Sequence, residues 1–132
     1  MKVVLDVSAA IEIILHKEKQ KSFEEVFLSA DRVIAPDLFV SEIANVFWKL
    51  QRAGLLSEDE CLGFTEDGIN MVDGFFNSAD LWKSALELSL RHNHPVYDML
   101  YLALAEKEKA LLMTNDRALA GLCGLRNVVC RS

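Results

Sequence analysis

The segment Lys2-Val-Val-Leu-Asp6 is typical of a short buried strand that ends in a carboxylate, and the prediction of the fold starts from it. Two further apolar runs, Arg32-Val-Ile-Ala35 and Leu111-Leu-Met-Thr114, have the pattern of the same kind of strand. Helical patterns separate the three runs, and strands that alternate with helices form parallel sheets covered on both faces. We therefore predict an α/β fold, a three-layer α/β/α sandwich around a short, mainly parallel sheet.

The spacing of apolar residues and the capping signals predict the remaining elements. Ser57 opens a capping-box pattern and Ser8 is a candidate N-cap, so a helix is expected at each position. The pattern over 70–76 is ambiguous between a loop and a short strand. The other expected elements are a strand over 127–130 and helices over 8–15, 17–29, 37–53, 79–92, 96–109 and 116–122.

Composition excludes several classes of protein. Of the 132 residues 52% are hydrophobic, no linker or low-complexity tract occurs, and one domain over 1–132 is expected. No apolar run approaches the ~18–20 residues of a membrane span, so we expect no membrane partner. Three cysteines without a CxxC spacing favour reduced thiols and a cytoplasmic location. A net charge of −6 argues against a basic nucleic-acid-binding surface, but not against phosphate contacts made through bound metal.

Two of the predicted strands end at an aspartate, Asp6 and Asp116. Ligands of open parallel sheets bind beyond the carboxyl ends of the strands. Either aspartate alone would serve equally well as the N-cap of the helix that follows it. Their equivalent positions, at one edge of the sheet, favour a shared acidic site.

Two helical carboxylates are expected to point towards the same site. Glu42 borders the apolar stripe of its helix, and Asp98 lies beside a stripe that we assign to Tyr97, Tyr101, Leu104 and Ala105. A charge this close to the core costs free energy unless it is paired or bound to metal. The alternative for Asp98 is a carboxylate favoured by the helix dipole just after Pro95.

Four converging carboxylates without an obvious basic partner would repel one another, and a hard divalent cation would relieve that repulsion. The sequence therefore favours a site for Mg²⁺ or Mn²⁺ that acts on phosphodiesters by a two-metal mechanism. Ser8 and Thr114 could add hydroxyl groups there, or merely cap helices. His92 and His94 are interpreted as a helix end and a surface loop, since no third nitrogen or sulfur ligand lies nearby.

Four segments, taken together, resemble the PIN-domain family and, within it, the single-domain VapC-type toxins of toxin–antitoxin modules. They lie in order along the chain: Val3-Val-Leu-Asp6-Val-Ser8, Pro36 with Ser41-Glu42-Ile-Ala-Asn45, Tyr97-Asp98-Met-Leu-Tyr-Leu-Ala-Leu-Ala105, and Leu111-Leu-Met-Thr114-Asn-Asp116. Two residues depart from the family pattern. Val7 stands where a smaller or hydroxyl residue is common, and Met99 stands where a small residue is usual.

The resemblance implies a single PIN-like domain with Mg²⁺- or Mn²⁺-dependent endoribonuclease activity, RNA as substrate, homodimers and inhibition by a cognate antitoxin. The catalytic and metal-binding residues that it implies are Asp6, Glu42, Asp98 and Asp116. Two alternatives stay open: a catalytically inactive PIN-fold binding or scaffold module, and a housekeeping RNA-processing nuclease without an antitoxin. Trp48 lies away from the core stripe of its helix, and it marks either an interface or a contact with a neighbouring helix.

Overall fold

A five-stranded, fully parallel sheet forms the centre of the computed structural model, which describes residues 1–132. The strand order is β3-β2-β1-β4-β5, so the first strand of the chain lies in the middle. Val3 of this strand pairs with Val33 on one side and Leu111 on the other. The strands are β1 (Lys2–Leu5), β2 (Arg32–Pro36), β3 (Gly74–Phe76), β4 (Leu111–Met113) and β5 (Cys130–Arg131).

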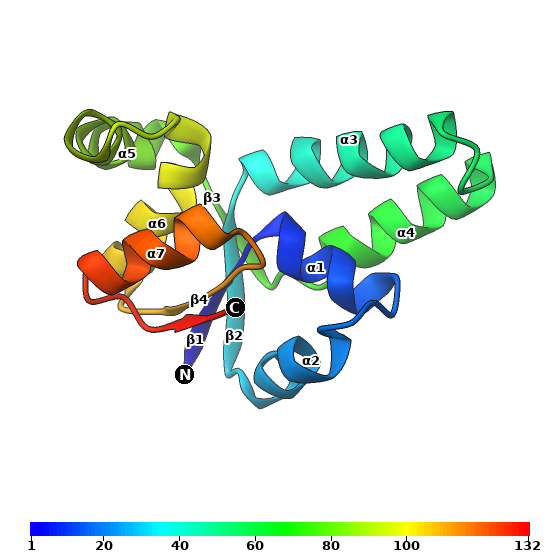
Figure 1. Ribbon diagram of the computed structural model, residues 1–132, viewed down its shortest axis with the longest axis horizontal. Coiled ribbons are helices and arrows are strands. Elements are labelled where there is room, and N and C mark those ends of the chain that lie inside the picture. Colours follow the sequence, from blue (N-terminus) through cyan, green and yellow to red (C-terminus); the bar gives the residue numbers. More distant parts are fainter.

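Helices cover both faces of this sheet, with α1, α2 and α4 on one side and α6 and α7 on the other (Figure 1). Helices α3 and α4 pack as an antiparallel pair joined at Gly54, whose φ of 79° suits glycine. The helices are α1 (Val7–Ile14), α2 (Gln20–Ser29), α3 (Leu38–Arg52), α4 (Glu58–Asn70), α5 (Ser78–His92), α6 (Val96–Glu108) and α7 (Arg117–Leu125). The predicted α/β/α sandwich is therefore confirmed.

One cluster of 31 buried hydrophobic residues forms the core. Helix α6 contributes an unbroken run of seven buried residues, Met99–Ala105, because it packs against the sheet on one face and against α5 on another. No helix of the chain is long and apolar enough to cross a membrane, and the three cysteines are free thiols.

Some local predictions were wrong. Asp6, and not Ser8, is the N-cap of the first helix, since the Asp6 side chain accepts a hydrogen bond from Ala9. The last strand begins at Cys130 because Asn127 adopts a left-handed backbone conformation, which no strand contains. Tyr97, which we assigned to the apolar stripe of α6, is 61% exposed, since the helix is buried only from Met99 onwards. The capping box at Ser57 and a short strand within 70–76 are both present.

Candidate functional site

Asp6 lies in the middle of the sheet edge where the parallel strands end, directly after β1. It is only 5% exposed, and both of its carboxylate oxygens accept hydrogen bonds from hydroxyl groups. Ser8 Oγ donates to Oδ1 at 2.5 Å, and Thr114 Oγ1 donates to Oδ2 at 2.6 Å. Burial raises the pKa of Asp6, whereas these hydrogen bonds oppose the rise. The position of Asp6 is thus fixed by β1, α1 and the residue that follows β4.

Asp116 is joined to Asp6 through Thr114. The Asp116 backbone N–H donates to Thr114 Oγ1 at 3.0 Å, and that hydroxyl donates in turn to Asp6. The Asp116 side chain caps α7 by accepting from the Leu119 N–H at 3.0 Å. Both strand-end aspartates therefore cap a helix and belong to one hydrogen-bonded network, so the two interpretations of these residues are compatible.

Glu42 of α3 approaches the same edge from a different element. Tyr101 of α6 donates its hydroxyl to Glu42 Oε1 at 2.6 Å. Burial raises the pKa of Glu42, the Tyr101 hydrogen bond lowers it, and the negative charges of Asp6 and Asp98 raise it further. Burial and the charge of Glu42 also raise the pKa of Tyr101, which keeps its hydroxyl protonated as a donor. Glu42, Asp6 and Asp98 therefore lie within electrostatic reach of one another.

Asp98 has a basic partner that the sequence interpretation missed. His94 Nε2 lies 2.8 Å from Asp98 Oδ2, so His94 contacts the acidic site and is not simply part of a surface loop. Asn93, with φ of 50°, ends α5 in a left-handed conformation and directs the chain back towards α6. The signal available in the sequence was the spacing of four residues between His94 and Asp98.

The four predicted acids thus gather at one edge of the sheet, but they do not form a closed cage. No group of three or more His, Cys, Asp or Glu side chains is arranged tightly enough to hold a metal ion by itself. Ser8 and Thr114, for which we left open a ligand-binding or a capping role, both donate hydrogen bonds to Asp6.

Trp48 lies on the outer surface of α3, the helix that carries Glu42. Its side chain is 48% exposed, and the Arg52 guanidinium lies 5.4 Å from the centre of the indole ring. The prediction that Trp48 points away from the core is confirmed.

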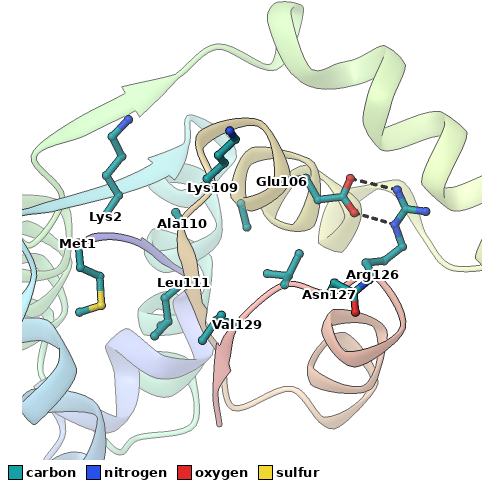
Figure 2. A pocket seen from close by; sticks show the side chains of 11 residues that line it. Met1, Lys2, Glu106, Lys109, Ala110, Leu111, Arg126, Asn127 and Val129 are labelled. Carbon is teal, nitrogen blue, oxygen red and sulfur yellow. Dashed lines mark hydrogen bonds and ion pairs between the residues drawn. The ribbon is translucent and has the colours of Figure 1, made fainter.

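A larger cavity, of about 710 Å³, lies at the opposite edge of the sheet (Figure 2). Met1, Lys2 and Leu111 line it at the starts of β1 and β4. Glu106 and Arg126 face each other across one side of this cavity and form an ion pair with two hydrogen bonds, of 2.7 and 3.2 Å. None of the four predicted acids lies there.

Comparisons with known proteins agree with this geometry. Ribonuclease VapC3 of Pyrobaculum aerophilum is 37% identical over 126 residues, covering 91% of this chain and 93% of the relative. The crystal structure of PAE2754 from the same organism superposes with a TM-score of 0.75 at 18% identity, covering 98% of this chain and 83% of the other. VapBC2 of Rickettsia felis, bound to a promoter DNA fragment, gives 0.69 at 12% identity and covers 99% and 98%. A PIN domain model matches residues 3–125, and this protein therefore belongs to the PIN domain family.

Proposed function

We propose that this protein is a metal-dependent endoribonuclease that acts as the toxin of a toxin–antitoxin pair. The observation that carries the proposal is the acidic edge, where burial and then the charges of Asp6 and Asp98 raise the pKa of Glu42. Acidic groups that repel one another inside a fold are costly unless they serve a bound cation. The relative at 37% identity, a ribonuclease by name, supports the reaction class.

The residues at this edge fit a hard divalent cation. Every candidate ligand is a carboxylate oxygen, which is the donor that Mg²⁺ and Mn²⁺ prefer. Mg²⁺ usually keeps several waters and binds through one or two carboxylates, so the lack of a closed cage does not conflict with it. We propose Asp6, Glu42, Asp98 and Asp116 as the ligands. One or two bound ions would supply Lewis-acid stabilisation of the phosphodiester and a more acidic water.

The chain's own residues orient these carboxylates. Ser8 and Thr114 hold the two oxygens of Asp6, so that its carboxylate has a single orientation. Tyr101 does the same for Glu42, and His94 for Asp98. Hydrogen bonds of this kind fix the direction of a ligand's lone pairs and typically contribute about 10–100-fold to metal affinity or activity.

RNA cleavage tests the proposal directly. A 5′-labelled single-stranded RNA incubated with the protein and Mg²⁺ or Mn²⁺ should give internal fragments, and EDTA should abolish them. Asp6→Asn is the inactive reference, and Asp67→Asn, a change on the exposed surface of α4, is the matched control. Absence of fragments with either metal would contradict the proposal and favour a binding or scaffold module.

Our proposal includes two protein partners, an antitoxin and a second copy of this chain. A similar structure from Klebsiella pneumoniae, with a TM-score of 0.69 at 15% identity, is named as a toxin–antitoxin complex. The exposed ring of Trp48 lies on the helix that carries Glu42, so one partner segment could contact both. An arginine in an antitoxin tail would pair bidentately with the carboxylates, and its apolar residues would pack on Trp48. Free thiols are consistent with action in the cytoplasm.

A charge placed at Trp48 tests these partners separately from the catalytic reaction. Trp48→Glu should weaken the homodimer, antitoxin binding or both, because a carboxylate would be buried in an apolar contact. Sedimentation velocity at micromolar concentration measures the first, and titration with the neighbouring gene's product measures the second. Leu62→Glu, at another exposed apolar position, is the control. A monomeric protein with unchanged antitoxin binding would exclude a role of Trp48 in both interfaces while leaving the nuclease proposal intact.

A further inference from the structure

A second cavity, of about 360 Å³, adjoins the acidic edge. It lies between α1, α3 and the residues that follow β4. Val7, Ile11 and Val46 give it apolar walls, and Lys17 contributes a cation. Its volume is within the range of ~300–1,000 Å³ that is usual for small-ligand sites.

Glu12 lines this cavity and is the least expected side chain there. The residue is only 6% exposed, although α1 is otherwise apolar on its buried side. Its Oε1 accepts a hydrogen bond from the Asn115 side-chain amide at 3.2 Å, whereas its Oε2 is buried without any partner. It forms no ion pair, since the four of this chain involve other residues.

An unpaired buried carboxylate oxygen destabilises a fold, so its presence calls for a donor that arrives from outside the chain. Asn115 holds the carboxylate in one orientation, which would make the second oxygen a directed acceptor. A ligand that offers N–H groups would complete the hydrogen bonding of Glu12 beside the apolar side chains of the cavity.

Ser8 links the cavity to the candidate active site, because it lines the cavity and is hydrogen-bonded to Asp6. Ser8 Oγ donates to Asp6 at 2.5 Å and accepts from the Asn115 backbone N–H at 2.8 Å. A nucleotide next to the phosphodiester held at Asp6 would therefore place its base beside Glu12. Apolar walls suit the two faces of a planar base, and Lys17 provides a cation for a phosphate of the same strand.

We propose that this cavity is a guanine-binding subsite in which Glu12 accepts hydrogen bonds from N1–H and N2–H₂ of the base. The inference rests on the proposed ribonuclease function, and it goes further by naming the base next to the cleaved bond. A carboxylate presents two acceptors side by side, and only guanine presents two adjacent donors on its pairing edge. Adenine, cytosine and uracil each place an acceptor where the second donor is needed, which would face the carboxylate unfavourably.

Nucleotide binding tests the subsite without any catalytic step. GMP, IMP, AMP and CMP, titrated into the wild-type protein and followed by amide chemical shifts, share one phosphate charge and differ only in the base. GMP should bind about tenfold or more tightly than AMP, and IMP, which lacks the N2 amine, should fall between them. Glu12→Gln should remove this order, whereas Glu25→Gln on the exposed side of α2 should keep it.

Equal binding of GMP and AMP to the wild-type protein would overturn the proposal, and so would a guanine preference that Glu12→Gln leaves unchanged. Glu12-dependent binding of N-acetyl-arginine amide without any binding of GMP would assign the cavity to a protein side chain and would likewise overturn it. These wild-type titrations remain decisive even if Glu12→Gln does not fold.

Cleavage of a randomised RNA pool separates this inference from the proposed function. Enrichment of guanine at one position next to the cut, lost in Glu12→Gln, would support both. Cleavage without such enrichment would refute the guanine subsite alone. No cleavage by the wild-type protein would refute the ribonuclease proposal, while the nucleotide titrations would still decide whether the cavity binds guanine.

Discussion

The two edges of the same parallel sheet differ in how their charges are compensated. At the edge where the strands begin, Glu106 pairs bidentately with Arg126 (Figure 2). Lys2 pairs with Glu108 at 2.9 Å at the same edge. At the edge where the strands end, only Asp98 of the four carboxylates forms an ion pair, with His94. The larger cavity lies at the compensated edge, and the smaller one adjoins the uncompensated edge.

The candidate active site is therefore marked by carboxylates without basic partners, and not by the size of a cavity. In an ion pair such as Glu106–Arg126 the two opposite charges neutralise each other, so the pair requires no ligand. The hydrogen bond to Glu106 raises the pKa of Arg126, so the guanidinium stays charged. Asp6 and Glu42 show the opposite behaviour: burial favours the neutral form of Asp6, and burial together with the charges of Asp6 and Asp98 favours the neutral form of Glu42.

Removing one charge at the uncompensated edge should have the largest effect on activity. Asp6→Asn, Asp98→Asn and Asp116→Asn should each lower the rate of RNA cleavage by about 100-fold or more, since even residues that only orient a metal ligand contribute ~10–100-fold. The melting temperature of the metal-free protein should hold or rise, because each change relieves repulsion. Cleavage at wild-type rates in all three variants would contradict the site, and loss of the folded state would show that the native hydrogen bonds of these residues outweigh the repulsion between them.

The pH dependence of stability should reveal the same uncompensated charge. The pKa values of Asp6 and Glu42 are raised above the ordinary 3.8 and 4.5, so folding favours their protonated forms. Without metal, their contribution to stability is fully present below those ordinary values and is lost as pH rises through the raised folded ones. Glu42→Gln keeps an acceptor for Tyr101 and should flatten this decline.

Melting temperatures between about pH 4 and about pH 8, in EDTA and in Mn²⁺, measure this effect. Mn²⁺ should raise the melting temperature of the wild-type protein most at the upper end of the range, where the carboxylates are ionised. Asp6→Asn should lose most of that gain. If the melting temperatures of wild type and Glu42→Gln depended on pH in the same way, ionisation of Glu42 would not destabilise the fold.

The sequence was sufficient to predict the carboxylates themselves. Asp6 and Asp116 follow apolar runs, and the carboxyl ends of parallel strands always meet at one edge, so their shared location did not depend on packing details. Glu42 and Asp98 followed from helical periodicity, which fixes the direction of a side chain relative to the core. These inferences used only local patterns and one rule of topology.

The partners of these carboxylates could not be predicted, because they depend on contacts between elements. Tyr101 was expected in the core, but its hydrogen bond to Glu42 requires α6 and α3 to meet across 59 residues of sequence. The left-handed residue Asn93 directs His94, whose contact with Asp98 forms only once α5 and α6 have been placed. The role of Glu12 could not be predicted either, since which of its oxygens lacks a partner is known only once Asn115 has been placed.

An intermediate effect is expected at His94, the only basic side chain paired with an acid of this edge. His94→Ala should lower kcat by about tenfold, because Asp98 would lose the hydrogen bond that orients it. His94→Gln, which can still donate to Asp98, should restore part of the rate with little change in KM. A merely structural residue would instead change the melting temperature of both variants in parallel with their activity, and that outcome would exclude a positioning role.

The smallest effect is expected at the compensated edge. Arg126→Ala breaks the pair with Glu106, whose side chain is 29% exposed and can be solvated when the guanidinium is removed. The loss of stability should therefore stay within the ~0.2–1 kcal/mol of a surface ion pair, and the rate of RNA cleavage should stay within about twofold of wild type. Thermal denaturation and the labelled-RNA assay measure the two quantities on the same preparation. If Arg126→Ala lowered cleavage as strongly as Asp98→Asn, the larger cavity would take part in the reaction, and the functional distinction between the two edges would be wrong.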